Sequence, residues 1–473
     1  MKSRGTPTPA FQKRAERGRA ARGQVPRAAH ETWTAASDRP DPLSLLEEQA
    51  ATRVPDLVPI RYSRMLQSPF AFFRGAALIM AADLAHTEDS GITVQLCGDA
   101  HLSNFGLYAS PERVLVFDMN DFDETLPGPW EWDVKRLAAS FEVMGRHRQF
   151  SDVERQALTR ATVSGYRKRM RKAAGSPVLT AWYDHLKADQ VVELFRPALR
   201  TVQKNGEKSN GPERVIAQAK KRDSARALAK LAEVVDGDLR IRANPPLVVP
   251  LADLAPSIRT REENESTVRD LLTDYQTTLS HDIHPMREFE YVDMARRVGG
   301  VGSVGTRAWI VLLRGRDNSD PLFLQAKQAE ASVLERFLPA SEYAHHGERV
   351  VRGQRIMQGA SDIFLGWQRV VGFDGQPRDF YVRQLHDWKG SADLENMPFA
   401  GALIYARICG ETLARAHARA GDRVAIAGYL GNSDRFDKAI GRFASAYADQ
   451  NERDFSAFSD AVASGRLTAS SGE

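Results

Sequence analysis

The sequence pattern of this chain changes from helical to strand-like near residue 286 and returns to helical near residue 400. Apolar residues recur at helical spacing through much of 41–285, whereas 286–390 holds short apolar runs separated by Gly and Asp turns. Helix-rich and strand-rich stretches in separate parts of a chain are typical of α+β folds. We therefore predict a small antiparallel β lobe from 286–390. A larger helical lobe would combine 41–285 with helices in 391–473.

Residues 1–40 are predicted to form a disordered basic arm. Residues 1–28 hold eight Lys or Arg side chains and one acid, so they account for all of the net charge of +4. The segment lacks apolar periodicity and is too polar to bury a core. Contacts with nucleic acid are expected, if anywhere, only from this arm.

Composition predicts a cytoplasmic protein without membrane association. No apolar run approaches the roughly 20 residues of a membrane span, and the N-terminus lacks the apolar region of a secretory signal. The two cysteines, Cys97 and Cys409, cannot form a disulfide framework.

A polar loop, 98–104, follows the first predicted strand, 92–97, and reads Gly-Asp-Ala-His-Leu-Ser-Asn. Phosphoryl transfer needs a carboxylate to accept the proton of the attacking hydroxyl, and oxygen ligands for Mg²⁺. Kinase catalytic loops supply both with the spacing Asp-x-x-x-x-Asn. We therefore predict Asp99 as the catalytic base and Asn104 as a metal ligand. The alternative is a polar loop whose Asp and Asn side chains cap turns.

Acidic residues also follow the next predicted strand, 114–117. Asp121, followed by Phe122, repeats the Asp-Phe pair of the kinase metal-binding motif. We favour Asp121 as the second metal ligand, with Asp118 and Asp123 as alternates.

A glycine-rich segment, 300–305, lies between two predicted strands. Glycines allow backbone N–H groups to approach phosphate oxygens closely. Lys327 ends the third predicted strand, where kinases place the lysine that pairs with nucleotide phosphates. The predicted nucleotide-binding residues are Gly300, Gly302, Ser303, Gly305 and Lys327, and Lys327 is also predicted to be catalytic. The alternative is a glycine-rich hairpin followed by an exposed lysine.

The two groups of motifs occur in the reverse of the kinase order, because the loop 98–104 precedes Lys327 by more than 200 residues. A circular permutation explains this order, with helix 401–418 as the helix that normally precedes the catalytic loop. Alternatively, helix 70–85 has that place and 401–418 is an addition. In either case we expect Lys327 and Asp99 to face one cleft.

Five segments resemble an uncharacterised bacterial family, domain of unknown function 2252. They are 68–75, 97–106, 117–125, 296–306 and 414–422, and they span about 40–460. The wider similarity is to the protein-kinase-like superfamily. Gly98, Asp99, His101 and Asn104 match the Gly-Asp-x-His-x-x-Asn of aminoglycoside phosphotransferases. The resemblance implies a kinase-like two-lobe fold, here circularly permuted.

The sequence departs from these patterns at two positions. Cys97 stands where a His usually precedes the loop motif, and Gln328 follows the lysine where the family usually has Glu. An acidic partner for Lys327 must therefore come from elsewhere, and Glu335 and Glu348 are the candidates.

The leading hypothesis is a phosphotransferase that uses ATP and Mg²⁺ on an unknown hydroxyl of a small molecule or protein, with nucleotidyl transfer as a variant. The two departures favour a nucleotide-binding regulatory pseudokinase as the competitor. A metal-dependent hydrolase using His101 with Asp99 and the acids of 118–123 ranks last, because it leaves Lys327 without a role.

Overall fold

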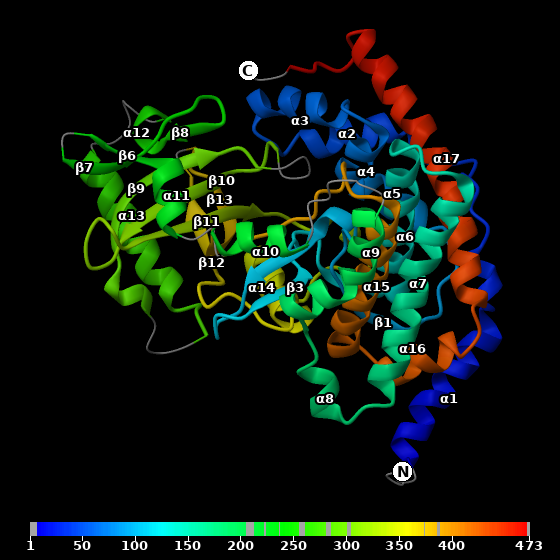
Figure 1. The fold of residues 1–473 in the computed structure, drawn as a ribbon. Coiled ribbons are helices and arrows are strands. Elements are labelled where there is room, and N and C mark those ends of the chain that lie inside the picture. The colour runs from blue at the N-terminus through cyan, green and yellow to red at the C-terminus, as the bar shows by residue number, and fades with distance from the viewer. Residues whose placement is uncertain are drawn as a thin grey trace.

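The computed structural model describes residues 7–204, 212–221, 224–235, 237–254, 261–280, 285–299, 304–372, 374–385 and 388–470. Figure 1 shows a β-rich part on one side and a helical body on the other, so the expected α+β class with antiparallel sheets is confirmed. Among the described residues, no helix has the length and apolar content needed to cross a bilayer.

A six-stranded antiparallel sheet dominates the β-rich part, with the order β12-β13-β11-β10-β9-β8. Its strands are β8 Val248–Pro250, β9 Glu290–Arg297, β10 Ala308–Arg314, β11 Pro321–Ala329, β12 Gly366–Val371 and β13 Pro377–Gln384. In this register Lys327 lies opposite Ala308 on one side and Tyr381 on the other. Residues opposite each other point to the same face, so Lys327 and Tyr381 share a face.

Both faces of the sheet are covered in its middle, because the strands carry apolar residues at successive positions. Leu322 and Leu324 face helix α13 Arg261–Gln276, where Tyr275 is buried. Phe323 points to the opposite face, toward α11 Ser224–Leu231 and the hairpin of β6 Ala232–Val235 and β7 Asp238–Ile241. The short helix α12 Leu251–Leu254 follows β8.

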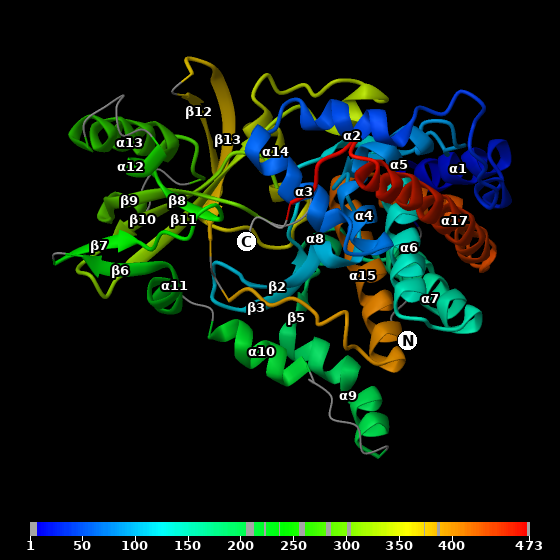
Figure 2. The ribbon, with the colours of Figure 1, turned by 90° about the horizontal axis from the view of Figure 1, so that it is seen from above.

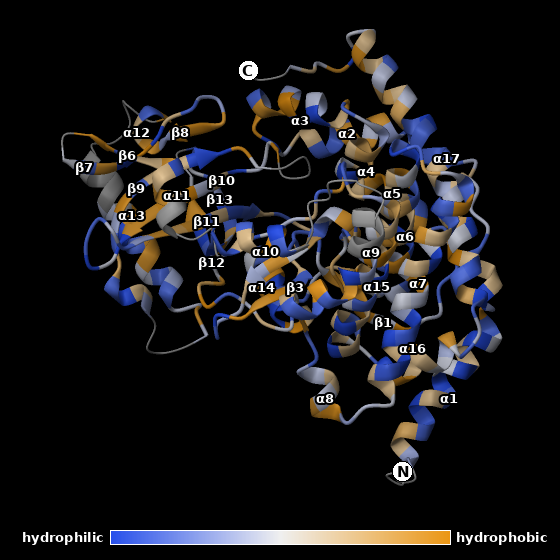
Figure 3. Ribbon diagram, viewed as in Figure 1, coloured by the Kyte–Doolittle hydropathy of each residue, from blue (hydrophilic) through white to orange (hydrophobic). Residues whose placement is uncertain are grey.

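The helical body is built from both ends of the chain (Figures 1 and 2). Its longer helices are α1 Pro9–Gln24, α6 Trp130–His147, α7 Asp152–Ala174, α15 Phe399–Ala420 and α17 Arg435–Ala463. Helix α9 Ala188–Lys204 is of similar length to α1. Shorter ones are α2 Pro42–Ala50, α3 Val58–Met65, α4 Pro69–Gly75, α5 Ala77–Leu84, α8 Val178–Trp182, α10 Pro212–Lys220 and α16 Arg423–Leu430. Figure 3 shows hydrophobic and hydrophilic residues alternating along α17, as expected for a helix with one buried side.

Local signals define several helix ends. Ser151 and Glu154 form a capping box at the start of α7, and Ser68 accepts the Ala71 N–H ahead of α4. Trp130 of α6 stacks on Tyr166 of α7 with ring centroids 5.5 Å apart, which ties these two helices together in the core.

Two small sheets lie beside the helical body. One pairs β1 Thr93–Leu96 with β4 Leu126–Pro129, and the other joins β2 Phe105–Ala109, β3 Leu115–Met119 and β5 Leu186–Lys187. Helix α14 His346–Met357 packs against both β13 and α15, so it connects the two parts of the molecule.

The prediction of a disordered arm is wrong for residues 9–30. Helix α1 packs on α16, and Gly18 lies so close that a Cβ on it would meet the Ala425 carbonyl oxygen at 1.9 Å. Arg14 pairs with Asp422 at 2.8 Å, and buried His30 contacts the Tyr429 hydroxyl at 2.7 Å. Helix α1 lacks an apolar stripe, and instead the missing side chain of Gly18 allows its backbone to pack directly against α16.

Three other expectations differ from the structure. The domain boundary at 285 falls too late, because β8 already pairs with β9 and α13 covers the sheet. The expected helix 70–85 is interrupted at Ala76. The Arg61 guanidinium donates a hydrogen bond to the carbonyl of the preceding residue, Gly75. The sequence pattern also predicts a helix over 330–337, and the structure has only the 3₁₀ turn Val333–Arg336 there.

Candidate functional site

The loop 97–104 is held by helix α6. The Asp133 carboxylate accepts the N–H groups of Cys97 at 2.8 Å and Gly98 at 3.1 Å, and the Ser140 hydroxyl accepts that of Leu102. Gly98 has φ +82°, and a Cβ there would meet the Glu124 carbonyl oxygen at 2.2 Å, so only glycine fits. Gly98, directly before Asp99, is therefore held by Asp133 on one side and enclosed by the Glu124 backbone on the other.

A buried chain of polar groups supports Asp133 from behind. His417 of α15 is fully buried, with its Nε2 3.1 Å from Asp133 and its Nδ1 2.9 Å from the Tyr166 hydroxyl. Three helices thus cooperate to orient one loop. Cys97, whose thiol pKa is raised well above its usual value by burial, is a neutral core residue.

Asp99 and Asn104 lie together, as their spacing predicts. The Asn104 side-chain N–H donates to the Asp99 carbonyl at 2.8 Å, which leaves the amide oxygen as an acceptor. The Asp99 carboxylate pairs with Arg136 of α6 at 2.5 Å. Burial raises the pKa of Asp99, and the Arg136 charge opposes that rise.

The three candidate acids of 118–123 have different environments. Asp118 is buried, accepts the N–H groups of Met119 and Gly359, and lies 3.7 Å from Arg419, so it is a structural residue outside the cavity described below. Asp123 uses both carboxylate oxygens for side-chain partners. The buried Oδ1 of Asp121 accepts no hydrogen bond within the described part of the chain. Among the three, Asp121 has the oxygen that is open to a ligand.

Lys327 and Tyr381 hold Asp123 between them. The Lys327 ammonium lies 2.6 Å from Asp123 Oδ2, and the Tyr381 hydroxyl donates to Oδ1 at 2.6 Å. Asp121 Oδ1 is 4.0 Å from the same ammonium. Burial would lower the pKa of Lys327, but Asp121 and Asp123 raise it above its usual value. Burial and repulsion from Asp123 raise the pKa of Asp121, whereas Lys327 holds that of Asp123 below its usual value despite burial.

The expected acidic partners of Lys327, Glu335 and Glu348, are wrong. Glu335 caps Ser332 and lies 3.9 Å from Arg349, while Glu348 pairs with Arg352 on α14. The acid turn 118–124 lies close enough to the sheet for Asp123 to be the counter-charge of Lys327. This tertiary contact has no local signal in the sequence.

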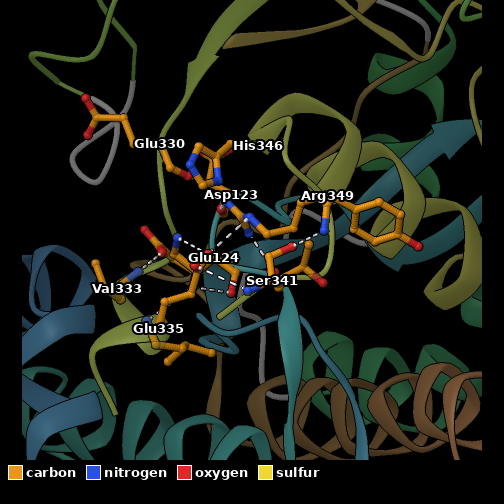
Figure 4. Close-up of polar contacts among 12 residues, drawn as sticks. Asp123, Glu124, Glu330, Val333, Glu335, Ser341, His346 and Arg349 are labelled. Atoms are coloured by element: carbon orange, nitrogen blue, oxygen red, sulfur yellow. Dashed lines mark hydrogen bonds and ion pairs between the residues drawn. The ribbon is translucent and has the colours of Figure 1, made fainter. Parts of the chain in front are cut away.

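Arg349 of α14 fixes the acid turn to the sheet (Figure 4). Its guanidinium donates to the carbonyls of Asp123, Thr125 and Glu330 at 2.6–2.8 Å, and the side chain is 1% exposed. Glu124 lies beside it and accepts the Val333 N–H at 2.8 Å, and burial raises its pKa to about 7. The position of Asp123 thus depends on α14 and β11 together.

Of the predicted glycine segment, Gly300, Gly302 and Ser303 lie outside the described residues. Gly305 has φ +91°, and its carbonyl accepts the Val54 N–H at 2.8 Å. Arg53 donates to the Val304 carbonyl at 2.5 Å, and Arg64 donates to the Gly299 carbonyl. The two described ends of this segment are therefore held by the stretch 53–64.

A cavity of about 220 Å³ brings the candidate residues together. Its walls include Asp99, Asn104, Asp121, Asp123 and Lys327, and also Gly299 at the entry to the glycine segment. Lys327 and Asp99 therefore face one cavity although they are 228 positions apart in the chain.

Sequence reasoning missed the cationic side chains of this cavity, Arg53, Arg61, Arg74 and Arg383. Arg74 belongs to the motif 68–75, which could have drawn attention to it, but the others occupy no recognisable pattern. Arg383 lies on β13, and its guanidinium donates a hydrogen bond of 2.8 Å to the Asn120 carbonyl.

Within the described ranges, no group of three or more His, Cys, Asp and Glu side chains is arranged to hold a metal ion. A metal site at Asn104 and Asp121 would therefore need further ligands from a bound molecule or from water. Mg²⁺ bound with a nucleotide is held in this manner, by one or two carboxylates together with phosphate oxygens and water.

Comparison with known families and structures places the chain in one family. The model of a family described as uncharacterized protein conserved in bacteria (DUF2252) matches residues 53–461, and the chain belongs to this family. No curated protein and no solved structure matches the chain.

Proposed function

We propose that this member of the DUF2252 family is a kinase-like phosphotransferase that transfers a phosphoryl group from ATP to a hydroxyl acceptor. The observation that carries the proposal is the shared cavity of Asp99, Asn104, Asp121 and Lys327, contributed by distant parts of the chain. These are the residue types that phosphoryl transfer requires: a base, metal ligands and a lysine for the phosphates.

Asp121 and Asn104 are the residues that would hold Mg²⁺. The buried Oδ1 of Asp121, which accepts no hydrogen bond within the described residues, and the amide oxygen of Asn104 are ligands that Mg²⁺ prefers. When bound, the ion would neutralise charge on the phosphates of ATP. Lys327 would pair with those phosphates and would share or leave its contact with Asp123 as it does so.

The end of helix α15 supports a circularly permuted kinase-like fold as part of this proposal. Gly421, directly after α15, forms an antiparallel bridge with Val94 of β1, the strand that leads into the loop 97–104. Helix α15 thus ends beside the catalytic loop, where a kinase has the preceding helix. This favours 401–418 over 70–85 for that place.

A second candidate function is nucleotide binding without transfer. The Asp99 carboxylate is paired with Arg136 at 2.5 Å, and a neighbouring cation makes a carboxylate a weaker base. A regulatory nucleotide-binding protein would be unaffected by this ion pair. A phosphotransferase would need Asp99 to accept the proton of the acceptor hydroxyl while one of its oxygens is bound to Arg136.

Thermal unfolding with nucleotide and Mg²⁺ tests the proposal. A ligand that binds only the folded state stabilises it by about 2.7 kcal/mol at a hundredfold excess over Kd. We expect Mg²⁺-dependent stabilisation by ATP that is lost in Lys327→Met and Asp121→Asn. It should be retained in the control Lys438→Met, which alters a half-exposed lysine on α17 that pairs with Asp434.

Each remaining outcome has a defined meaning. Stabilisation by ATP without phosphate release or transfer to any of a panel of hydroxyl acceptors would favour the regulatory protein. Stabilisation by metal alone would favour the hydrolase. Absence of any nucleotide effect on the wild-type chain would overturn the proposal.

A further inference from the structure

Three arginines line the wall of the cavity on its helical side. Arg53, Arg61 and Arg74 come from the stretch that contains α2, α3 and α4, and all three line the same cavity as Asp99. Within the described residues, none of them forms an ion pair with a carboxylate. Their buried Nε atoms, and NH1 of Arg61, find no hydrogen-bond partner in the part of the chain that the structure describes.

Arg61 shows most clearly that a counter-charge is missing. It is 1% exposed, and its NH2 donates only to neutral oxygens, Gln49 Oε1 at 2.7 Å and the Gly75 carbonyl at 2.9 Å. Burial, with a smaller contribution from Arg53, lowers its pKa well below the usual value. A buried cation of this kind is unfavourable unless an anion pairs with it.

Other buried arginines of this protein are paired with carboxylates. Arg39 contacts both Asp83 and Asp454 at 2.6 Å, and Arg167 contacts Asp437 at 2.7 Å. Arg53 and Arg61 therefore differ from the other fully buried arginines that the structure describes.

The acids of the cavity are already engaged elsewhere. Asp123 is paired with Lys327, Asp99 is paired with Arg136, and Glu124 has a pKa near 7 and accepts the Val333 N–H. Asp121 faces Lys327 at 4.0 Å. The cavity thus holds more cationic than acidic groups. Asp99 and Asp121 act on Arg74 from a distance, but Arg53, Arg61 and Arg74 have no direct ion pair within the described residues.

We propose that Arg53, Arg61 and Arg74 bind an anionic group, a phosphate or a carboxylate, carried by the acceptor. The acceptor is then a small anionic metabolite with a free hydroxyl. Guanidinium groups suit this role because their planar N–H donors match phosphate and carboxylate oxygens in pairs. The contacts of Arg61 to Gln49 and Gly75 hold its guanidinium in place before the ligand arrives.

The anion site rests on the arginines alone, whereas its assignment to an acceptor rests on the proposed function. The same chemistry could be supplied by the phosphates of the nucleotide. The experiment therefore separates these two sources.

Isothermal titration with inorganic phosphate as the probe tests the site, alone and with saturating Mg²⁺ and a nonhydrolysable ATP analogue. We expect phosphate to bind the wild-type chain, and to bind at least tenfold more weakly in Arg61→Gln and Arg74→Gln. Lys327→Met should lose the nucleotide and keep phosphate binding. Arg352→Gln, which alters an exposed arginine paired with Glu348, should keep both.

The outcomes separate the two proposals. Phosphate binding that is absent, or unchanged in both arginine variants, overturns the anion site. Phosphate that is displaced by the nucleotide analogue, together with loss of nucleotide binding in Arg74→Gln, overturns the acceptor and assigns the arginines to ATP. Phosphate binding that depends on the arginines, in a chain that binds no nucleotide, upholds the anion site and overturns the phosphotransferase.

If Arg61→Gln does not fold, phosphate binding by Arg74→Gln decides between these outcomes, because Arg74 is only half-buried.

Discussion

The Lys327 ammonium lies 2.6 Å from the Asp123 carboxylate, although 204 positions separate the two residues. This ion pair joins β11 of the sheet to the acid turn of the helical body, and the Tyr381 hydroxyl holds the second oxygen of the same carboxylate. This contact therefore places Lys327 of the sheet beside the acid turn that carries Asp121 and Asp123.

Replacing Lys327 with Met should lower the free energy of unfolding by about 3 kcal/mol at pH 7, because the Asp121 and Asp123 carboxylates remain without their cation. Lys327 holds the pKa of Asp123 below the value of the unfolded chain. The contribution of the pair is thus present at neutral pH and is lost as the pH falls through the folded-state pKa. Urea unfolding at several pH values should show a deficit that shrinks below pH 4. A deficit independent of pH would contradict this account, and adding Asp123→Asn should restore part of the stability at pH 7.

Glu124 should make the protein less stable as the pH rises through the neutral range. Burial raises its pKa from 4.5 to about 7, so its protonated form favours the folded state below pH 4.5 and that stabilisation is lost between pH 4.5 and 7. In Glu124→Gln, which can still accept the Val333 N–H, this dependence should disappear. Relative to the wild type, the variant should gain at most about 3 kcal/mol between pH 4.5 and 8. Parallel pH profiles for the two proteins would show that Glu124 does not titrate in this range.

Arg61→Met should stabilise the ligand-free protein, because it replaces an unpaired buried cation with an apolar chain of similar length. The expected gain in unfolding free energy is about 1–2 kcal/mol, measured by urea denaturation. Arg167→Met provides the control, because Arg167 is also buried, at 6% exposed, but is paired with Asp437, and there we expect a loss of about 3 kcal/mol. A loss of similar size in both variants would mean that Arg61 has a counter-charge in solution.

Gly18→Leu should detach α1 or strain its contact with α16, because a Cβ at this position would meet the Ala425 backbone at 1.9 Å. We expect a loss of about 1–3 kcal/mol in thermal or urea unfolding. The control is Gly23→Leu on the same helix, where a Cβ would meet nothing within 4 Å. Equal stability of the two variants would show that α1 does not depend on close packing at Gly18.

The sequence pattern predicted the elements that carry local signals. Short apolar runs bounded by turn residues predict strands over 289–297, 309–313 and 322–327. The strands β9, β10 and β11 begin and end within two residues of these ranges. The pairing of Asp99 with Asn104 followed from their spacing in one loop. These relationships depend on residues that are close in the chain.

The remaining features depend on contacts that no local pattern encodes. Helix α1 is amphipathic only weakly, and it is ordered by the close approach of Gly18 to α16. The partner of Lys327 proved to be Asp123, because folding brings β11 against the acid turn. Arg53, Arg61 and Arg74 come from one stretch of the chain, but their common feature, a place in the cavity wall without a carboxylate partner among the described residues, exists only in the folded chain.

The joining of both chain ends in the helical body has a consequence for how the protein is synthesised. Asp133, which holds the loop before Asp99, is completed by His417, and that residue leaves the ribosome 284 positions later. Until α15 and α17 emerge, the nascent chain carries apolar faces of α7 and α6 uncovered, and such surfaces promote aggregation and chaperone binding. The candidate catalytic loop is therefore among the earliest parts of the chain to be made and among the last to acquire its final geometry. Messages truncated before codon 417 would yield chains that contain every candidate catalytic residue and still lack a formed site.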